Sequence, residues 1–115
     1  MKLSHIPAAF IALLIFASLI MAQAVLPRMT SVEPVTAKAG AEVSVAGENL
    51  DKGNVTEVYL TDGKNDFKVQ VTQQAAAAIK FKVPDSMKPG RFSLMVLTAT
   101  KPTRLVEQPV RLTVE

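Results

Sequence analysis

The sequence of 115 residues contains no cysteine and no tryptophan, and only one histidine and one tyrosine. Without cysteine the chain has no disulfide, no thiol nucleophile and no thiolate metal ligand. Small exported domains often depend on disulfides, so a chain of this composition relies on its packed core instead. The single histidine, His5, lies in the N-terminal segment. The remainder therefore lacks the commonest general base and the commonest neutral metal ligand.

These absences exclude most kinds of catalytic site. Four serines, Ser31, Ser44, Ser86 and Ser93, follow the N-terminal segment, but no histidine is available to activate them and no G-x-S-x-G motif occurs. So short a chain also has no insertion that would form a cleft around paired carboxylates. We therefore expect no enzyme, no cofactor and no metal site.

The first 24 residues have the three parts of a secretory signal peptide. Lys2 and His5 precede an apolar run over residues 8–22, which is followed by the small-residue site Ala22-Gln23-Ala24. This pattern predicts a leader helix over residues 1–24, cleavage between Ala24 and Val25, and a mature domain over residues 25–115. We expect the protein to be bacterial, and secreted or periplasmic.

The alternative for this segment is an uncleaved membrane anchor, which would be the protein's only contact with a membrane. The apolar run of about 15 residues is shorter than the roughly 20 that a membrane-spanning helix needs. Loss of Lys2 changes the count of 13 basic and 10 acidic residues to 12 (13 − 1) and 10. This balance is far from the concentrated positive charge of a nucleic-acid binder, so we expect no nucleic-acid partner.

After residue 25, short runs rich in β-branched and aromatic residues alternate with Gly, Pro, Asn and Asp. This spacing is typical of an all-β sandwich. The predicted strands span residues 28–32, 42–46, 57–61, 67–72, 79–83, 91–99 and 110–114. Apolar and polar residues alternate along them, which places one set inward: Val43, Val45, Val58, Leu60, Phe67, Val69, Val71, Ile79, Phe81, Val83, Phe92, Leu94, Val96, Val110, Leu112 and Val114. The prediction is an immunoglobulin-like β-sandwich of about seven strands.

Two connecting segments have their own signals. Asp62-Gly63 lies between two predicted strands and predicts a tight hairpin, because glycine accepts the positive φ of such turns. Residues 75–78 are four consecutive alanines. Alanine favours helix, but four residues cannot nucleate a stable one, so we expect a loop or a single helical turn.

The residues in this order resemble a known family. Residues 40–50, GAEVSVAGENL, are similar to the signature of the IPT/TIG domain, an immunoglobulin-like domain. Residues 29–34, 79–84 and 89–96 resemble its opening strand and two later strands, so the resemblance covers roughly residues 27–115. It implies that Gly40 and Gly47 permit turns at the two ends of a strand, and that Leu50 plugs one end of the sandwich. It also implies a domain that binds proteins, DNA or glycans, or that spaces other domains.

We expect a partner-binding face at Tyr59, Met95 and Leu97, with Arg111 beside them. The third, sixth and seventh strands are neighbours in one sheet of an immunoglobulin-like sandwich. If Phe92 faces the core, Met95 and Leu97 face outward beside Tyr59. An exposed apolar stripe with a tyrosine and an arginine is typical of a protein-binding face. The alternatives are a shifted strand register and a loop over residues 100–109 that folds across these side chains.

A second group, Asp62, Asn65 and Asp66, lies in one turn and offers oxygen atoms to calcium. Calcium loops usually carry more carboxylates at alternating positions. A hairpin whose Asx side chains bond its own backbone explains the group better.

Two functions remain open. The first is an exported, non-catalytic module of the cell envelope that binds another protein. The alternative is a carbohydrate-binding accessory module, for which the mature chain offers few aromatic platforms because Phe67, Phe81 and Phe92 are assigned to the core. DNA binding conflicts with the signal peptide.

Overall fold

The computed structural model describes residues 25–115. The predicted leader helix, with Ala22 and Ala24 of the expected cleavage site, lies outside the described residues. Val25, the expected first residue of the mature chain, is 52% exposed. Between residues 25 and 115 no helix has the length and hydropathy needed to cross a bilayer.

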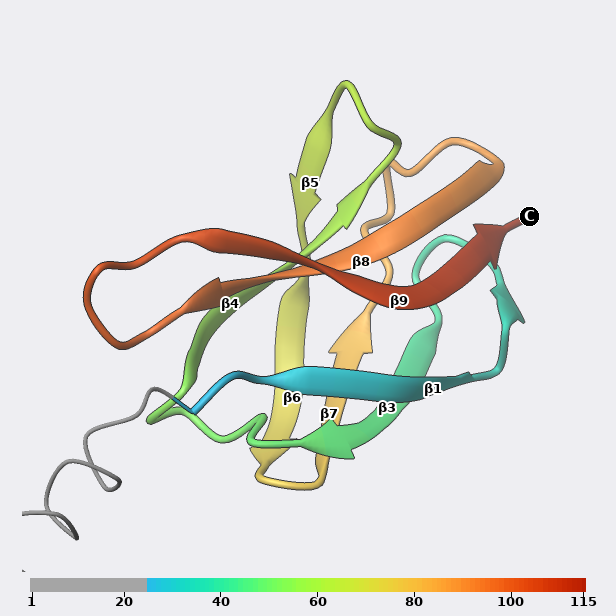
Figure 1. Ribbon diagram of the computed structural model, residues 1–115. Helices are drawn as coiled ribbons and strands as arrows, with labels where there is room; N and C mark the ends of the chain where they lie inside the picture. The colour runs from blue at the N-terminus through green and yellow to red at the C-terminus, as the bar shows by residue number, and fades with distance from the viewer. Residues whose placement is uncertain (1–24) are drawn as a thin grey trace, which may run out of the picture.

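The described chain forms two β-sheets that lie face to face (Figure 1). The four-stranded sheet contains, in spatial order, β1 (Arg28–Glu33), β3 (Glu42–Glu48), β7 (Ala78–Lys82) and β6 (Gln70–Ala75). The five-stranded sheet contains β2 (Thr36–Ala37), β9 (Leu105–Val114), β8 (Gly90–Thr98), β4 (Val55–Thr61) and β5 (Asp66–Lys68). All pairs of strands are antiparallel except β2 with β9. The predicted all-β sandwich is confirmed.

The core lies between the two sheets and is built from the alternating positions of their strands. Val43, Val45, Ile79 and Phe81 come from the four-stranded sheet, and Val58, Leu60, Leu94, Val96 and Leu112 from the five-stranded sheet; none is more than 1% exposed. Because the side chains of a strand alternate between its two faces, the intervening residues of these strands point away from the core. For these residues the inward assignment made from the sequence is confirmed.

One predicted strand is divided between the two sheets. The alternation predicts a single strand over residues 67–72, but Phe67 belongs to β5 beside β4, while Gln70 begins β6 beside β7. The chain crosses at Val69, whose N–H donates to the carbonyl oxygen of Val58 at 3.0 Å. The assignment of Phe67 to the core is therefore wrong, since it is 36% exposed. The alternation of side chains continues through the crossing, so the sequence pattern does not reveal it.

Two further features differ from the prediction, whereas the alanine run forms a loop, which is one of the two forms expected for it. β2 is a short additional strand, and together with the division of residues 67–72 into β5 and β6 it makes nine strands in the described chain rather than about seven. β9 begins at Leu105 rather than Val110, so the connection before it is shorter than expected. The alanine run forms the hairpin turn between β6 and β7. Its carbonyl oxygens at Ala76 and Ala77 accept hydrogen bonds from Leu50 and Gly47, which fixes a turn rather than a helix.

The segment over residues 40–50 forms β3 and the bends at its ends. Leu50 is completely buried, as the resemblance implies, and Asn49 before it has a φ of 57°. Gly47 differs from the expectation because it lies within β3 rather than in a turn. A Cβ atom at this position would lie 2.1 Å from the carbonyl oxygen of Arg28, so glycine is required for the close approach of β1.

Candidate functional site

The outer face of the five-stranded sheet brings together the residues that the sequence singled out. Strand order and register arrange them in three rows across β9, β8, β4 and β5. The rows are Glu107–Met95–Tyr59–Lys68, Leu105–Leu97–Glu57 and Arg111–Ser93–Thr61–Asp66. Residues directly opposite each other in an antiparallel pair point to the same side of the sheet. We call the surface formed by these rows the outer sheet face.

Tyr59 and Met95 are direct cross-strand partners in the central row of this face. Tyr59 is half-buried and Met95 is only 9% exposed, between Tyr59 and Glu107. Met95 is therefore covered by its neighbours and does not form part of the exposed surface of the expected stripe. Leu97 is half-buried in the adjacent row, and its partner Leu105 is 47% exposed.

Sequence reasoning missed Leu105 because the alternation places the start of the last strand at Val110. The signal that could have found it is the apolar pair Leu105-Val106, but Pro109 four residues later argues against a strand that continues through it. The structure does not contain the alternative that we considered, a loop over residues 100–109 that folds across this face. Instead, Leu105 pairs with Leu97 in the sheet and extends the apolar surface.

Arg111 lies in the third row, opposite Ser93, and is exposed. Between the rows of Met95 and Ser93 the register of β9 shifts, which adds residues to β9 between Glu107 and Arg111. Arg111 and Glu107 line a shallow pocket of about 250 Å³ beside the buried Thr61. Arg111 is thus at the border of the apolar stripe and does not adjoin Leu97.

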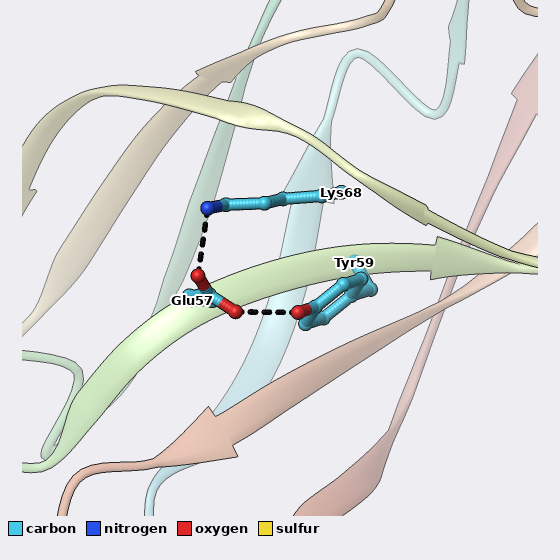
Figure 2. Close-up of polar contacts among 3 residues, drawn as sticks. All are labelled: Glu57, Tyr59 and Lys68. Carbon is cyan, nitrogen blue, oxygen red and sulfur yellow. Dashed lines mark hydrogen bonds and ion pairs between the residues drawn. The ribbon is translucent and has the colours of Figure 1, made fainter.

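A polar network fixes the side chain of Tyr59 on this face (Figure 2). The Tyr59 hydroxyl donates a hydrogen bond to Glu57 Oε1, and Lys68 Nζ lies 2.7 Å from Glu57 Oε2. The Lys68 ammonium, and after it the Tyr59 hydroxyl, holds the pKa of Glu57 below its usual range. The Glu57 carboxylate in turn raises the pKa of Tyr59. The hydrogen bond and the ion pair thus favour the state in which Glu57 is ionised and Tyr59 is protonated.

The group considered for calcium forms a hairpin loop between β4 and β5. Asp62 Oδ1 accepts hydrogen bonds from the backbone N–H groups of Lys64 at 2.8 Å and Asn65 at 2.6 Å. These bonds lower the pKa of Asp62. The carboxylate is thus turned toward its own backbone, as in an Asx turn. In residues 25–115 no three His, Cys, Asp or Glu side chains are grouped so that they would hold a metal ion.

A family model for the IPT/TIG domain matches residues 27–114, which is nearly all of the described chain. The chain belongs to the IPT/TIG domain family. The resemblance found in the sequence is thereby confirmed. In this IPT/TIG domain the signature segment supplies β3 and the buried Leu50, and the candidate residues lie on the opposite sheet.

Solved bacterial proteins share this IPT/TIG fold. One is a protein of unknown function from Bacteroides thetaiotaomicron, with a TM-score of 0.65 and 22% identity over 79% of this chain and 22% of that one. Another is an auxiliary nutrient binding protein from Bacteroides ovatus, with a TM-score of 0.55 and 17% identity over 79% of this chain and 21% of that one. The present chain therefore spans about a fifth of each of these proteins. No protein with a curated description matches the sequence.

The IPT/TIG domain also has a cleft at one end of the sandwich that sequence reasoning missed. It has a volume of about 680 Å³ and lies between the β4–β5 hairpin and the connection from β7 to β8. The exposed ring of Phe67 lines it, together with Phe92 from the start of β8. The alternation of residues 67–72 assigns Phe67 to the core, so no signal in the sequence places a surface aromatic here.

Proposed function

We propose that this IPT/TIG domain is an exported, non-catalytic binding module of the cell envelope, and that its outer sheet face binds another protein. The observation that carries the proposal is the pairing of Leu97 with Leu105, next to Tyr59, on an otherwise polar sheet surface. The signal-peptide pattern of residues 1–24 supports export. A binding role also agrees with the name of the Bacteroides ovatus protein, an auxiliary nutrient binding protein.

The chemistry of the outer sheet face suits a protein partner. Leu105, with 47% of its surface exposed, and the half-buried Leu97 supply an apolar centre, and Tyr59 adds an aromatic ring with a polar tip. Protein interfaces are typically rich in such aromatic residues at the centre and polar at the rim. Here Glu107 and Arg111 supply charges of opposite sign on one side of the centre.

The network around Glu57 prepares Tyr59 for binding. Because its hydroxyl is already bonded to Glu57, which Lys68 holds from β5, the tyrosine loses less rotamer freedom when a partner covers it. Immobilising a free side chain costs roughly 0.5–1.5 kcal/mol on association, and a side chain held beforehand avoids part of that cost. Tyr59 is therefore the anchor that we expect to contribute most.

A non-catalytic role agrees with the residues available in the mature chain. The only histidine of the sequence is His5 in the leader, and cysteine is absent. The serines of residues 25–115 consequently have no histidine to act as their base. Binding, rather than bond cleavage, is the chemistry that this set of side chains supports.

The test is photo-crosslinking in the native host. A photoreactive residue is placed at Leu97, at Leu105 and, as a control on the other sheet, at the exposed Lys80 of β7. We expect one discrete protein adduct from Leu97 and Leu105 and none from Lys80. The same adduct is then followed in proteins that carry the crosslinker at Leu105 together with Tyr59→Ala.

Two results would overturn the proposal. One is the same set of adducts from Lys80 as from Leu97, which would indicate random encounters. The other is an adduct that Tyr59→Ala reduces no more than the control Val35→Ser does, at a 65% exposed apolar residue outside the three rows. We expect Tyr59→Ala to reduce the adduct at least about tenfold, since tyrosine is enriched among binding hot spots.

A further inference from the structure

The cleft at the end of the sandwich has the dimensions of a ligand site. It lies between the β4–β5 hairpin and the connection from β7 to β8, which run side by side (Figure 1). Its volume of about 680 Å³ falls within the roughly 300–1,000 Å³ of small-ligand sites. It is separate from the apolar centre of the outer sheet face, because none of Tyr59, Leu97 and Leu105 lines it.

Phe67 gives this cleft an aromatic surface that is both exposed and supported. More than a third of Phe67 (36%) is exposed, whereas Phe92 is only 6% exposed. The two rings are perpendicular, with an interplanar angle of 88° and centroids 6.1 Å apart. This edge-to-face contact is a favourable aromatic geometry, so Phe92 holds the Phe67 ring in position at the surface.

The frame of the cleft is fixed by hydrogen bonds on the hairpin side. Asp62 Oδ1 accepts from two backbone N–H groups, and the N–H of Gly63 donates to Thr61 Oγ1 at 3.1 Å. On the other side, the N–H of Met87 donates to the carbonyl oxygen of Pro84, and the Met87 side chain is buried. A site that is formed before binding loses little entropy when a ligand enters.

Charged groups of both signs surround Phe67. Lys64, Lys88 and Arg91 line the cleft with Asp66, and among residues 25–115 none of these four takes part in an ion pair. The lysines and the arginine donate hydrogen bonds, and the aspartate accepts them. With Asp62 included, three cations face two anions, so the cleft does not strongly favour an anionic ligand.

We propose that this cleft binds an uncharged oligosaccharide, with one pyranose ring stacked on Phe67. A sugar ring combines a face of C–H groups with a rim of hydroxyls that both donate and accept hydrogen bonds. The C–H face fits the Phe67 ring, and the hydroxyls fit Lys64, Lys88 and Asp66 around it. A purely apolar ligand would leave these charged groups without partners, which is costly where they lose water. This site is additional to the protein-binding face and does not depend on it, although Asp66 at the end of the third row borders both.

The experiment is a titration of the exported protein, followed by the NMR signals of its backbone amides. The probes are cellohexaose, xylohexaose and mannohexaose, at concentrations up to several millimolar. We expect at least one of them to shift signals in the hairpin of residues 62–67 and in residues 86–92. Phe67→Leu should reduce its affinity about tenfold, because leucine offers no flat ring on which a sugar can stack. Phe67→Tyr, which keeps the ring, should bind as the unchanged protein does.

The controls separate this site from the proposed protein-binding face. Leu105→Ser should leave oligosaccharide binding unchanged, and Phe67→Leu should leave the crosslinked adduct from Leu97 unchanged. The proposal is overturned if none of the three oligosaccharides shifts these signals, or if Phe67→Leu binds with undiminished affinity while its amide spectrum stays folded. It is also overturned if only polygalacturonate binds and its binding disappears with added salt, which would identify a site for anions.

Discussion

Gln108 of β9 accepts a hydrogen bond through its side-chain Oε1 from the backbone N–H of Met29 in β1, at 2.7 Å. The two residues are 79 positions apart in the sequence and belong to different sheets. Gln108 is 5% exposed and Met29 is fully buried, so no solvent would replace this bond. It joins the two sheets along one edge of the sandwich.

Loss of this bond should destabilise the domain. Gln108→Leu keeps most of the side-chain volume but removes the acceptor, which leaves the buried N–H of Met29 without a partner. Such a group costs about 1–3 kcal/mol. The measurement is the urea concentration at half-unfolding, with the exposed Gln73→Leu in β6 as the matched control. Equal midpoints for the two variants would show that the sheets are not held together here.

Gly47→Ala should be more damaging than Gly63→Ala. At Gly47 the added methyl group meets the backbone of β1, with the carbonyl oxygen of Arg28 only 2.1 Å away, and overpacking of this kind costs about 3 kcal/mol. At Gly63 the φ of 93° disfavours alanine by roughly 1–2 kcal/mol, but nothing lies within 4 Å. Thermal unfolding of both variants measures which substitution lowers the stability more. A Gly47→Ala protein at least as stable as Gly63→Ala would contradict the close approach of β1 and β3.

The ionisation of Tyr59 should report directly on Glu57. Tyr59 is the only tyrosine of the chain and tryptophan is absent, so the absorbance change of tyrosinate follows this one group. Glu57→Gln removes the negative charge that raises the pKa of Tyr59, and the titration should therefore move to lower pH. Glu42→Gln, at an exposed carboxylate on the other sheet, should leave the titration in place. An unchanged titration in Glu57→Gln would show that the hydroxyl does not bond to this carboxylate in solution.

The same network should make stability depend on pH at both extremes. The pKa of Glu57 is lowered on folding, so its contribution is present above about pH 4.3 and is lost as the pH falls through the lower, folded value. The pKa of Tyr59 is raised, so its contribution is present below about pH 10 and is lost as the pH rises through the higher, folded value. Urea midpoints of the unchanged protein and Glu57→Gln should therefore differ at pH 7 and converge in acid. A constant difference across this range would exclude the ionised network as its cause.

The expected processing of the leader is tested on the protein itself. If residues 1–24 form a signal peptide, mass spectrometry of the exported protein should find Val25 as its first residue. Ala24→Leu places a large side chain where the peptidase accepts small ones, and the precursor should then accumulate at full length. Ser18→Leu, within the apolar run, is the control and should be processed normally. An unchanged protein that retains residues 1–24 at the membrane would instead indicate the anchor.

The general fold could be predicted from the sequence because the signals for it are local. The alternation of apolar and polar residues identifies the buried positions of β3, β4, β7 and β8, and the segment over residues 40–50 indicates the family. The candidate site follows in part from the same alternation. Tyr59, Met95 and Leu97 lie on one outer face because the strands of the family are ordered in one way, and the register then pairs Tyr59 with Met95.

Only the tertiary structure decided two features that the local sequence pattern does not mark: the exposure of Phe67 and the contact between β1 and β9. Phe67 occupies a position that the alternation of apolar and polar residues assigns to the core. The chain passes from one sheet to the other at Val69, and an alternation with a period of two residues does not mark such a crossing. Only the packing of the two connecting segments makes Phe67 the exposed wall of a cleft. The bond from Met29 to Gln108 likewise depends on how β1 and β9 meet in space. Local periodicity thus determined which residues are buried in a regular strand, whereas long-range packing determined which side chains meet at the ends and edges of the sandwich.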